Sequence, residues 1–126
     1  MKKILALLLA AQTLTGCFWL VAGGAGAAGA YVWSHGNLTR HYQQPFETTW
    51  EGTMHALRVM DLPVVDSKKD KYDGVIKAKM PGGRDKLIVS LERWTDRETR
   101  VTVRAGALGD KAFSERAHEE IAKALR

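Results

Sequence analysis

The sequence predicts a two-layer α+β sandwich, in which an antiparallel sheet meander carries two amphipathic helices on one face. Four segments between residues 36 and 105 alternate apolar and polar side chains, as half-buried strands do. Two other segments place apolar side chains three or four positions apart, which is the spacing of a helix with one buried face. Because sheets and helices must bury their apolar sides, the two helices are expected to cover the sheet.

The first strand and the first helix are expected before residue 63. Residues 36–42 alternate, with Leu38 and Tyr42 on the apolar side of the strand. Pro45 suits the first turn of the helix that follows, and Pro63 prevents this helix from continuing. The apolar stripe of the helix consists of Phe46, Trp50, Met54, Leu57 and Met60.

The other strands and the second helix follow in order. A short strand begins at residues 64–65, and residues 68–74 are expected to form a polar turn. Asp110 is a suitable N-cap for the last helix. The apolar stripe of that helix consists of Phe113, Ala117, Ile121 and Leu125. The three strands between these elements span residues 75–80, 87–91 and 101–105.

The first residues resemble the signal peptide of a bacterial lipoprotein. Lys2 and Lys3 precede a short apolar run, and the residues Leu-Thr-Gly-Cys follow at positions 14–17. These four residues look like a lipobox, and Cys17 is the only cysteine of the chain. The resemblance implies cleavage before Cys17, acylation of its thiol and amino group by fatty acids such as palmitate, and a mature protein tethered to a membrane.

An uncleaved N-terminal anchor is the alternative. Apolar character continues past Cys17 to Ala22, and no Lys, Arg, Asp or Glu occurs between Lys3 and Arg40. This segment could therefore span a bilayer, with Lys2 and Lys3 on the cytoplasmic side. The lipobox favours the lipoprotein interpretation, and in either case most of the chain is expected outside the cytoplasm.

The chain is expected to have three parts. Residues 1–16 form the signal peptide, residues 17–34 the lipidated cysteine with a Gly/Ala-rich tether, and residues 35–126 a single α+β domain. The glycines of residues 22–30 favour a tether over close packing against lipid or another helix. In bacterial lipoproteins, an aspartate directly after the lipidated cysteine retains the protein in the inner membrane. The resemblance to them implies that this chain, which has Phe18 there, is located at the outer membrane facing the periplasm, with the inner membrane as the alternative.

The charge of the chain is mildly basic. It has 19 Lys and Arg residues against 14 Asp and Glu residues, a formal charge of +5. Removal of Lys2 and Lys3 with the leader lowers this charge to +3, which does not indicate a nucleic-acid partner. A single cysteine allows no internal disulfide, so the domain depends on its apolar core for stability.

No motif of the sequence indicates catalysis, a metal or a cofactor. The histidines, which are His35, His41, His55 and His118, lack the spacing of a metal site and are expected to face solvent or cap helices. Ser114 and His118 lie one helical turn apart and are expected to form a surface pair. An enzyme would need a cleft that brings His41 or His55 to a carboxylate. We therefore expect no catalytic residues and no cofactor.

One face of the predicted sheet is rich in cations. Ile88 forms an apolar island on this face, Glu92 is the only acid in register with the cations, and Trp94 lies at the end of a strand. Such a face could bind anionic lipid headgroups, lipopolysaccharide phosphates or an acidic protein. The alternative is an ordinary solvated face whose lysines keep the sheet soluble. The cations are Lys77, Lys79, Lys86, Arg100 and Arg104.

The chain also resembles a known family over essentially its whole length. After the lipobox and tether come the run Gly-Asn-Leu-Thr-Arg-His-Tyr at residues 36–42, a Pro-Phe-Glu-x-x-Trp helix start at residues 45–50, and a last helix after Gly109. This arrangement is similar to small bacterial lipoproteins of the DUF3568 family. The resemblance implies an envelope location and a fold, but no chemistry. We expect a non-catalytic periplasmic interaction module, with an anionic-lipid or lipopolysaccharide binding module as the second hypothesis.

Overall fold

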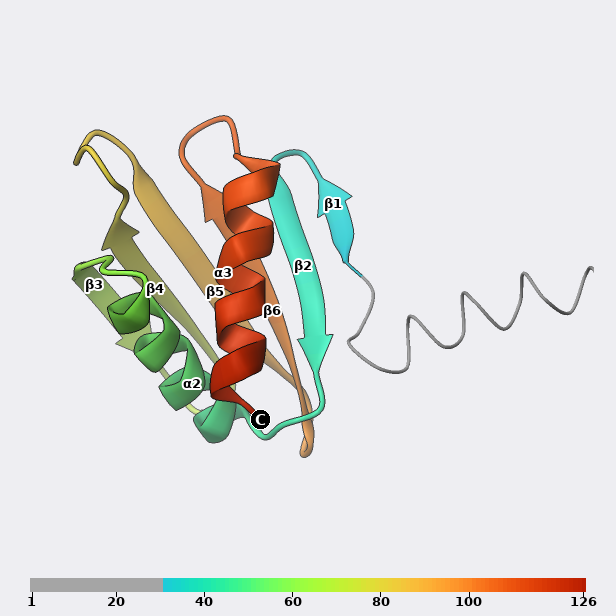
Figure 1. The fold of residues 1–126 in the computed structure, drawn as a ribbon. Helices are drawn as coiled ribbons and strands as arrows, with labels where there is room; N and C mark the ends of the chain where they lie inside the picture. Colours follow the sequence, from blue (N-terminus) through green and yellow to red (C-terminus); the bar gives the residue numbers. More distant parts are fainter. Residues whose placement is uncertain (1–30) are drawn as a thin grey trace, which may run out of the picture. The chain divides into compact units, whose positions relative to one another are not determined.

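Six antiparallel strands form one sheet, and two helices pack on one of its faces (Figure 1). The computed structural model describes residues 31–126, so the predicted signal peptide, Cys17 and most of the predicted tether lie outside the described residues. The strands are β1 (Val32–Ser34), β2 (Asn37–Tyr42), β3 (Val64–Lys69), β4 (Asp73–Lys79), β5 (Lys86–Thr95) and β6 (Glu98–Ala105). The helices are α2 (Phe46–Val59) and α3 (Lys111–Ala124).

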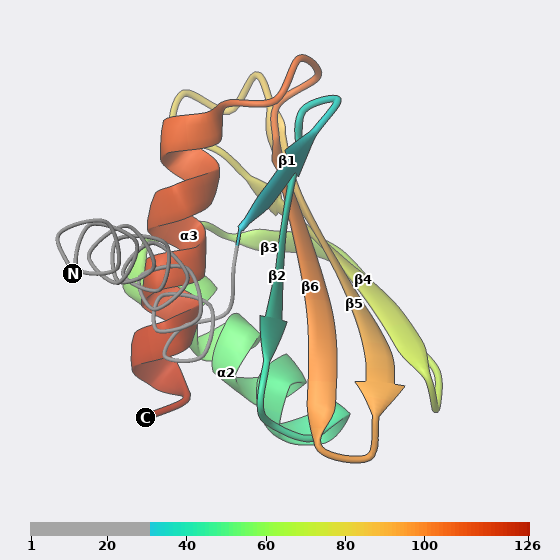
Figure 2. The ribbon, with the colours of Figure 1, turned by 90° about the vertical axis from the view of Figure 1, so that its right-hand side faces the viewer.

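The order of the strands across the sheet is β1-β2-β6-β5-β4-β3. Each neighbouring pair is antiparallel, and the connection between β2 and β3 passes through α2 to the far edge of the sheet. A side view shows α2 and α3 on the same side of the sheet, and no helix of residues 31–126 lies on its other face (Figure 2). This arrangement confirms the predicted two-layer α+β sandwich.

The core lies between the sheet and the helices. Alternate residues of the four inner strands are completely or almost completely buried, which confirms the predicted alternation of apolar and polar side chains. The same face also buries Trp50 and Leu57 from α2 and Ile121 from α3. The buried apolar side chains of the sheet are Leu38, Tyr42, Ile76, Ala78, Leu87, Val89, Leu91, Val101, Val103 and Ala105.

The buried side of α2 is more polar than its predicted stripe. Phe46, Trp50 and Leu57 are buried as predicted, but Met54 is only partly buried. Thr49 and Thr53 take places in the interior because each hydroxyl donates a hydrogen bond to a carbonyl one helical turn earlier. A threonine can therefore be buried in this helix without an unpaired hydroxyl.

A strand that the sequence analysis did not predict begins the described fold. We assigned residues 31–34 to the tether, but Val32–Ser34 form β1 and pair with β2. The two-residue turn between these strands has positive φ at His35 (51°) and Gly36 (86°), which is the geometry of a type I′ hairpin. The described fold thus starts at Tyr31, a few residues earlier than the predicted boundary at residue 35.

The third strand is longer than predicted. Val64–Lys69 pair with β4, so the expected turn at residues 68–74 shortens to residues 70–72. The Asp70 carboxylate closes this turn by accepting hydrogen bonds from the backbone N–H groups of Tyr72 (2.8 Å) and Asp73 (3.0 Å). β3 is an exposed edge strand with charged side chains and a bulge, features that discourage pairing with another sheet.

The last helix begins as predicted. The Asp110 carboxylate accepts a hydrogen bond from the backbone N–H of Phe113 (3.1 Å), which satisfies one donor of the first helical turn. Ala117 and Ile121 face the core, but Ser114 and His118 are buried beside them. The expectation that Ser114 and His118 form a surface pair is therefore wrong.

Candidate functional site

The uncovered face of the sheet carries the side chains that the sequence analysis singled out. Pairing of the strands places Lys77, Ile88 and Arg104 side by side on β4, β5 and β6. Lys79 lies directly opposite Lys86 on the neighbouring strand. The sheet therefore brings the predicted cations to one face, but the geometry divides them into two groups with different roles.

Arg104 belongs to the structural group. Its Nη1 donates hydrogen bonds to the His35 carbonyl (2.7 Å) and to Oδ1 of Asn37 (3.4 Å). Its Nη2 donates to the carbonyl of Ala107. The guanidinium thus joins the β1–β2 turn to the loop after β6, and its donors are directed at carbonyls of this chain. Arg104 is therefore a clamp between two loops and a poor candidate for binding an external anion.

Arg100 is also engaged within the chain. It forms an ion pair with Glu92 on β5. Its guanidinium lies 5.0 Å from the centre of the Trp94 ring, and the His41 ring approaches the same indole at 5.1 Å, nearly perpendicular to it. The Trp94 side chain is 52% exposed, which confirms its predicted exposure. These contacts leave Arg100 partly neutralised, so the basic surface is smaller than predicted.

The three lysines form the second group. Lys79 and Lys86 are exposed, and Lys77 is half-buried beside Ile88. Among residues 31–126, no carboxylate lies within ion-pair distance of these three ammonium groups. Like charges directly opposite each other in a sheet are locally destabilising, as at Lys79 and Lys86. This cluster is the part of the predicted surface that can meet an external anion.

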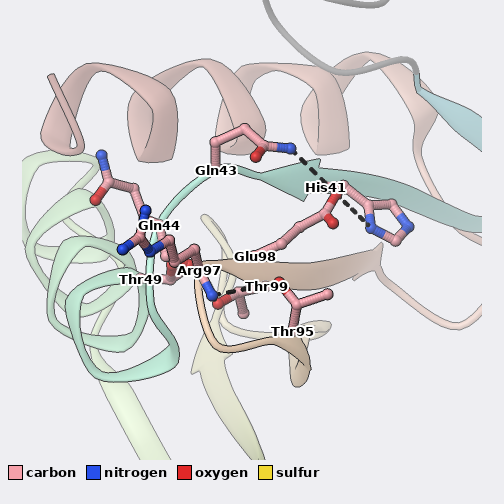
Figure 3. Close-up of polar contacts among 8 residues, drawn as sticks. All are labelled: His41, Gln43, Gln44, Thr49, Thr95, Arg97, Glu98 and Thr99. Carbon is pink, nitrogen blue, oxygen red and sulfur yellow. Dashed lines mark hydrogen bonds and ion pairs between the residues drawn. The ribbon is translucent and has the colours of Figure 1, made fainter.

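His41 meets a carboxylate at the other end of the uncovered face. Its Nδ1 lies 3.4 Å from Oε1 of Glu98, which also accepts a hydrogen bond from the Gln43 side chain (3.2 Å) (Figure 3). The backbone of Gln44 is held nearby, because its carbonyl accepts a hydrogen bond from the Thr99 hydroxyl (2.9 Å). The pairing that an enzyme would need is thus present, as a surface pair between β2 and β6.

No described cavity contains this pair. A cavity of about 390 Å³ opens between the C-terminal end of α2 and the start of β3. Two smaller ones lie beside α3 and near the β5–β6 turn, and His41 and Glu98 line none of the three. In the part of the chain that the structure describes, no three His, Cys, Asp or Glu side chains are grouped to hold a metal ion. The residues that line the largest of these cavities are Met54, Arg58, Asp61, Leu62, Pro63 and Val64.

A buried polar cluster joins α3 to β2. His118 is fully buried, and its Nε2 lies 2.8 Å from the carbonyl of Leu38. Because a carbonyl only accepts, Nε2 carries the proton, and Nδ1 of the neutral ring faces the Tyr42 hydroxyl at 2.7 Å. Burial, opposed by the hydrogen bond to the Leu38 carbonyl and reinforced by the charge of Arg40, lowers the pKa of His118 to about 4. The imidazole is therefore neutral at pH 7.

Arg40 completes this cluster from the inner face of β2. It is 7% exposed, and its guanidinium lies 5.2 Å from the Tyr31 ring centre and 4.9 Å from the Tyr42 ring centre. Its Nη1 also donates a hydrogen bond to the Tyr31 hydroxyl (3.1 Å). Burial raises the pKa of the Tyr42 hydroxyl well above its usual value, although the nearby Arg40 charge opposes this shift. The cluster fixes α3 on the sheet and lies away from solvent.

The sequence matches a family model that extends over nearly the whole chain. The match covers residues 2–124 and is described as a protein of unknown function (DUF3568). The chain belongs to the DUF3568 family. Membership confirms the resemblance drawn from the sequence, and no curated protein matches the chain. The DUF3568 match includes the N-terminal segment with Cys17 as well as the folded part.

The described part of this DUF3568 protein contains no helix that is both long and apolar enough to cross a membrane.

The buried cluster around His118 was not predicted from the sequence. The signal for it was the spacing of Ser114, Ala117, His118 and Ile121, which places all four side chains on one helix face. The partners of His118 on β2 are about eighty residues away in the chain, so the sequence did not indicate that this histidine could form hydrogen bonds there.

Proposed function

We propose that this DUF3568 protein is a lipid-tethered, non-catalytic interaction module of the bacterial envelope. Acylated Cys17 holds it at the periplasmic face of the outer membrane. The proposal is supported by the lipobox at residues 14–17, by the position of the only cysteine in it, and by a family match that starts at residue 2. The family match extends over the predicted leader as well as the folded part.

The interaction role rests on the uncovered sheet face. A sheet that buries one face under helices can leave the other face in solvent, and that face is then available for contacts. Here it carries Lys77, Lys79 and Lys86 without described ion pairs, together with the exposed Trp94. Polar side chains that could do chemistry, such as His41 and Glu98, are paired with each other on an open surface. This arrangement favours recognition over catalysis.

The tether is tested by a Cys17→Ser substitution in cells that are fed a labelled fatty acid. The native chain should carry the label and fractionate with the outer membrane, whereas the Cys17→Ser chain should carry none, because the acylated atom is absent. An unlabelled native chain that keeps its leader would contradict the proposal and would indicate an N-terminal membrane span instead.

The contact surface is tested in the same cells with a photo-crosslinking residue in place of one lysine. A crosslinker at Lys77 on the uncovered face should capture a reproducible partner. The matched position is Lys123, an exposed lysine on α3. Equal capture from both positions, or capture from Lys123 alone, would contradict the assignment of the uncovered face.

A further inference from the structure

One end of the sheet combines positive charge with an unusually exposed leucine. The β1–β2 turn, the β4–β5 turn and the loop that leads from β6 to α3 lie together at this end (Figure 1). Leu108, in that loop, is 94% exposed and is the most exposed large apolar side chain of the described residues. We refer to Leu108, the β1–β2 turn and the β4–β5 turn with Lys79 and Lys86 as the basic end.

The loop that carries Leu108 is held firmly. Arg104 donates hydrogen bonds to the Ala107 carbonyl within this loop and to the His35 carbonyl in the β1–β2 turn. Gly109 packs directly on Gly36, and a Cβ atom added to Gly109 would lie 2.4 Å from the Gly36 Cα. The backbone N–H of Gly106 also donates to the Lys86 carbonyl (3.0 Å). The exposure of Leu108 is therefore a property of an ordered loop.

Basic residues outnumber acidic ones at this end of the sheet. The basic residues of this end are Lys79, Arg84, Lys86, Arg104 and Lys111, and the acidic ones are Asp85 and Asp110. Asp110 caps α3, and Arg104 is the clamp described above. The opposite end of the sheet differs in sign. Its two turns, taken with the strand residues that flank them (69–73 and 95–98), carry Asp70, Asp73, Asp96 and Glu98 against Lys69, Lys71 and Arg97.

We infer that the basic end docks on the surface of an anionic phospholipid bilayer. Leu108 enters the boundary between headgroups and acyl chains, and Lys79, Arg84 and Lys86 lie against lipid phosphates. An apolar side chain gains free energy at that depth, while lysines and arginines gain it at a negatively charged surface. Binding of lipid phosphates also gives a reason for the two lysines Lys79 and Lys86 to lie opposite each other in the sheet. A phosphate between them would remove their repulsion.

This inference rests on the proposed lipid tether and goes beyond it by naming which end faces the lipid. The covalent reach of the tether does not decide that question. Residues 18–30 can span at most about 45 Å, whereas a ten-residue strand such as β5 is only about 34 Å long. Either end of the sheet could therefore reach the membrane. Charge and the exposure of Leu108 select the basic end.

The test uses the full, acylated chain reconstituted into vesicles, with an environment-sensitive dye on Leu108→Cys. In vesicles containing 30% phosphatidylglycerol the dye emission should shift to shorter wavelength, and in pure phosphatidylcholine it should not. The same dye on Asp96→Cys, in the β5–β6 turn at the opposite end, should show no shift in either vesicle. Raising the salt concentration to 1 M should reverse the shift at position 108, because salt screens surface attraction.

Charge variants identify the cations that are involved. Lys79→Gln with Lys86→Gln should lower the ratio of docked to undocked protein by about thirtyfold, since each lysine near an anionic surface contributes a factor of about five. Lys71→Gln with Lys123→Gln removes the same charge elsewhere and should leave the ratio unchanged. Both lysines of this control lie away from the basic end.

Each other outcome overturns the inference. A dye at position 108 that does not shift in anionic vesicles excludes docking on lipid, and a shift that appears only with envelope extracts indicates a protein partner instead. Equal effects of the two lysine pairs exclude a specific basic end. The chain without the Leu108→Cys substitution tests the tether separately. If the dye reacts with Cys17 of that chain, its thiol is free, which contradicts acylation. In that case Cys17→Ser in the Leu108→Cys chain still tests docking.

Discussion

Acidification from pH 7 to pH 4 should lower the free energy of unfolding by about 3 kcal/mol through His118. Its pKa is about 4 in the folded protein and about 6.5 in the unfolded chain. Between these values the unfolded state binds the proton and the folded state does not, so stability falls as the pH falls. The contribution of the neutral imidazole is complete above pH 6.5 and is lost near pH 4, where both states are protonated. Such a loss is a large fraction of the free energy of unfolding of a folded protein, which is usually about 5–15 kcal/mol.

The physical reason is the position of His118 in the buried cluster. Its ring is enclosed by Tyr42 and Tyr31, with ring centres 5.9 Å and 5.5 Å away, and the nearest charge that acts on it is that of Arg40. Protonation would place a second positive charge beside this buried guanidinium. Within residues 31–126, no carboxylate forms an ion pair with His118 that could compensate it.

Urea unfolding between pH 4 and pH 7 measures this effect, with His118→Gln and His41→Gln as the variants. His118→Gln should remove the slope between pH 6.5 and pH 4, whereas His41→Gln should keep it because His41 lies on the surface. Titration of the imidazole signals by NMR provides a second measurement if His118→Gln does not fold. A His118 signal that titrates near pH 6.5 would show that the ring is accessible to protons and would contradict the prediction.

The sheet and the helix layer could both be predicted, because each depends on a local period of apolar side chains. The alternation along β4, β5 and β6 and the stripe in α2 follow from the side-chain spacing of strands and helices. β1 escaped prediction because three residues are too few to show a period, although Tyr31, Val32 and Trp33 favour strands and Gly36 favours the turn. Its place in the sheet depends on pairing with β2 and not on its own pattern.

Two cations of the predicted surface, Arg100 and Arg104, form contacts within the chain. Charge and alternation put Arg100 and Arg104 on the same face as the lysines, and the structure agrees with that placement. The ion pair of Arg100 with Glu92 fits the register predicted from the sequence. The contacts of Arg104 could not be inferred, because this side chain binds backbone carbonyls that any sequence would supply. The sequence does not show which backbone carbonyls lie near an arginine. Only the fold shows that Arg104 joins two loops and is not available to an external anion.

Trp50 and Trp94 represent the opposite outcome, in which the sequence separated a core residue from a surface residue. Trp50 follows the helical stripe of α2 and is 8% exposed, whereas Trp94 ends a strand and lies largely in solvent. The Phe46 ring lies 6.1 Å from the Trp50 ring, and the Lys69 ammonium lies 5.4 Å from its centre. These two side chains therefore predict very different effects of the same substitution.

Trp50→Ala should destabilise the domain by about 3–5 kcal/mol, because it removes a large buried side chain and leaves a cavity between α2 and the sheet. Trp94→Ala is the matched control and should cost less than about 1 kcal/mol, as substitutions at exposed sites usually do. Urea unfolding followed by circular dichroism measures both. Equal costs for the two substitutions would contradict the assignment of Trp50 to the core.

A double-mutant cycle with Gly74 locates the contact. A Cβ atom on Gly74 would lie 2.5 Å from Cζ3 of Trp50, so the indole packs directly on the β4 backbone where only a glycine leaves room. Gly74→Ala should therefore destabilise the native protein by pushing the ring away. It should cost less in the Trp50→Ala background, where of these close neighbours only the Lys68 carbonyl oxygen remains, 3.0 Å from the added Cβ. Coupling of this kind is expected only between residues in contact, and additive costs would show that the ring does not rest on Gly74.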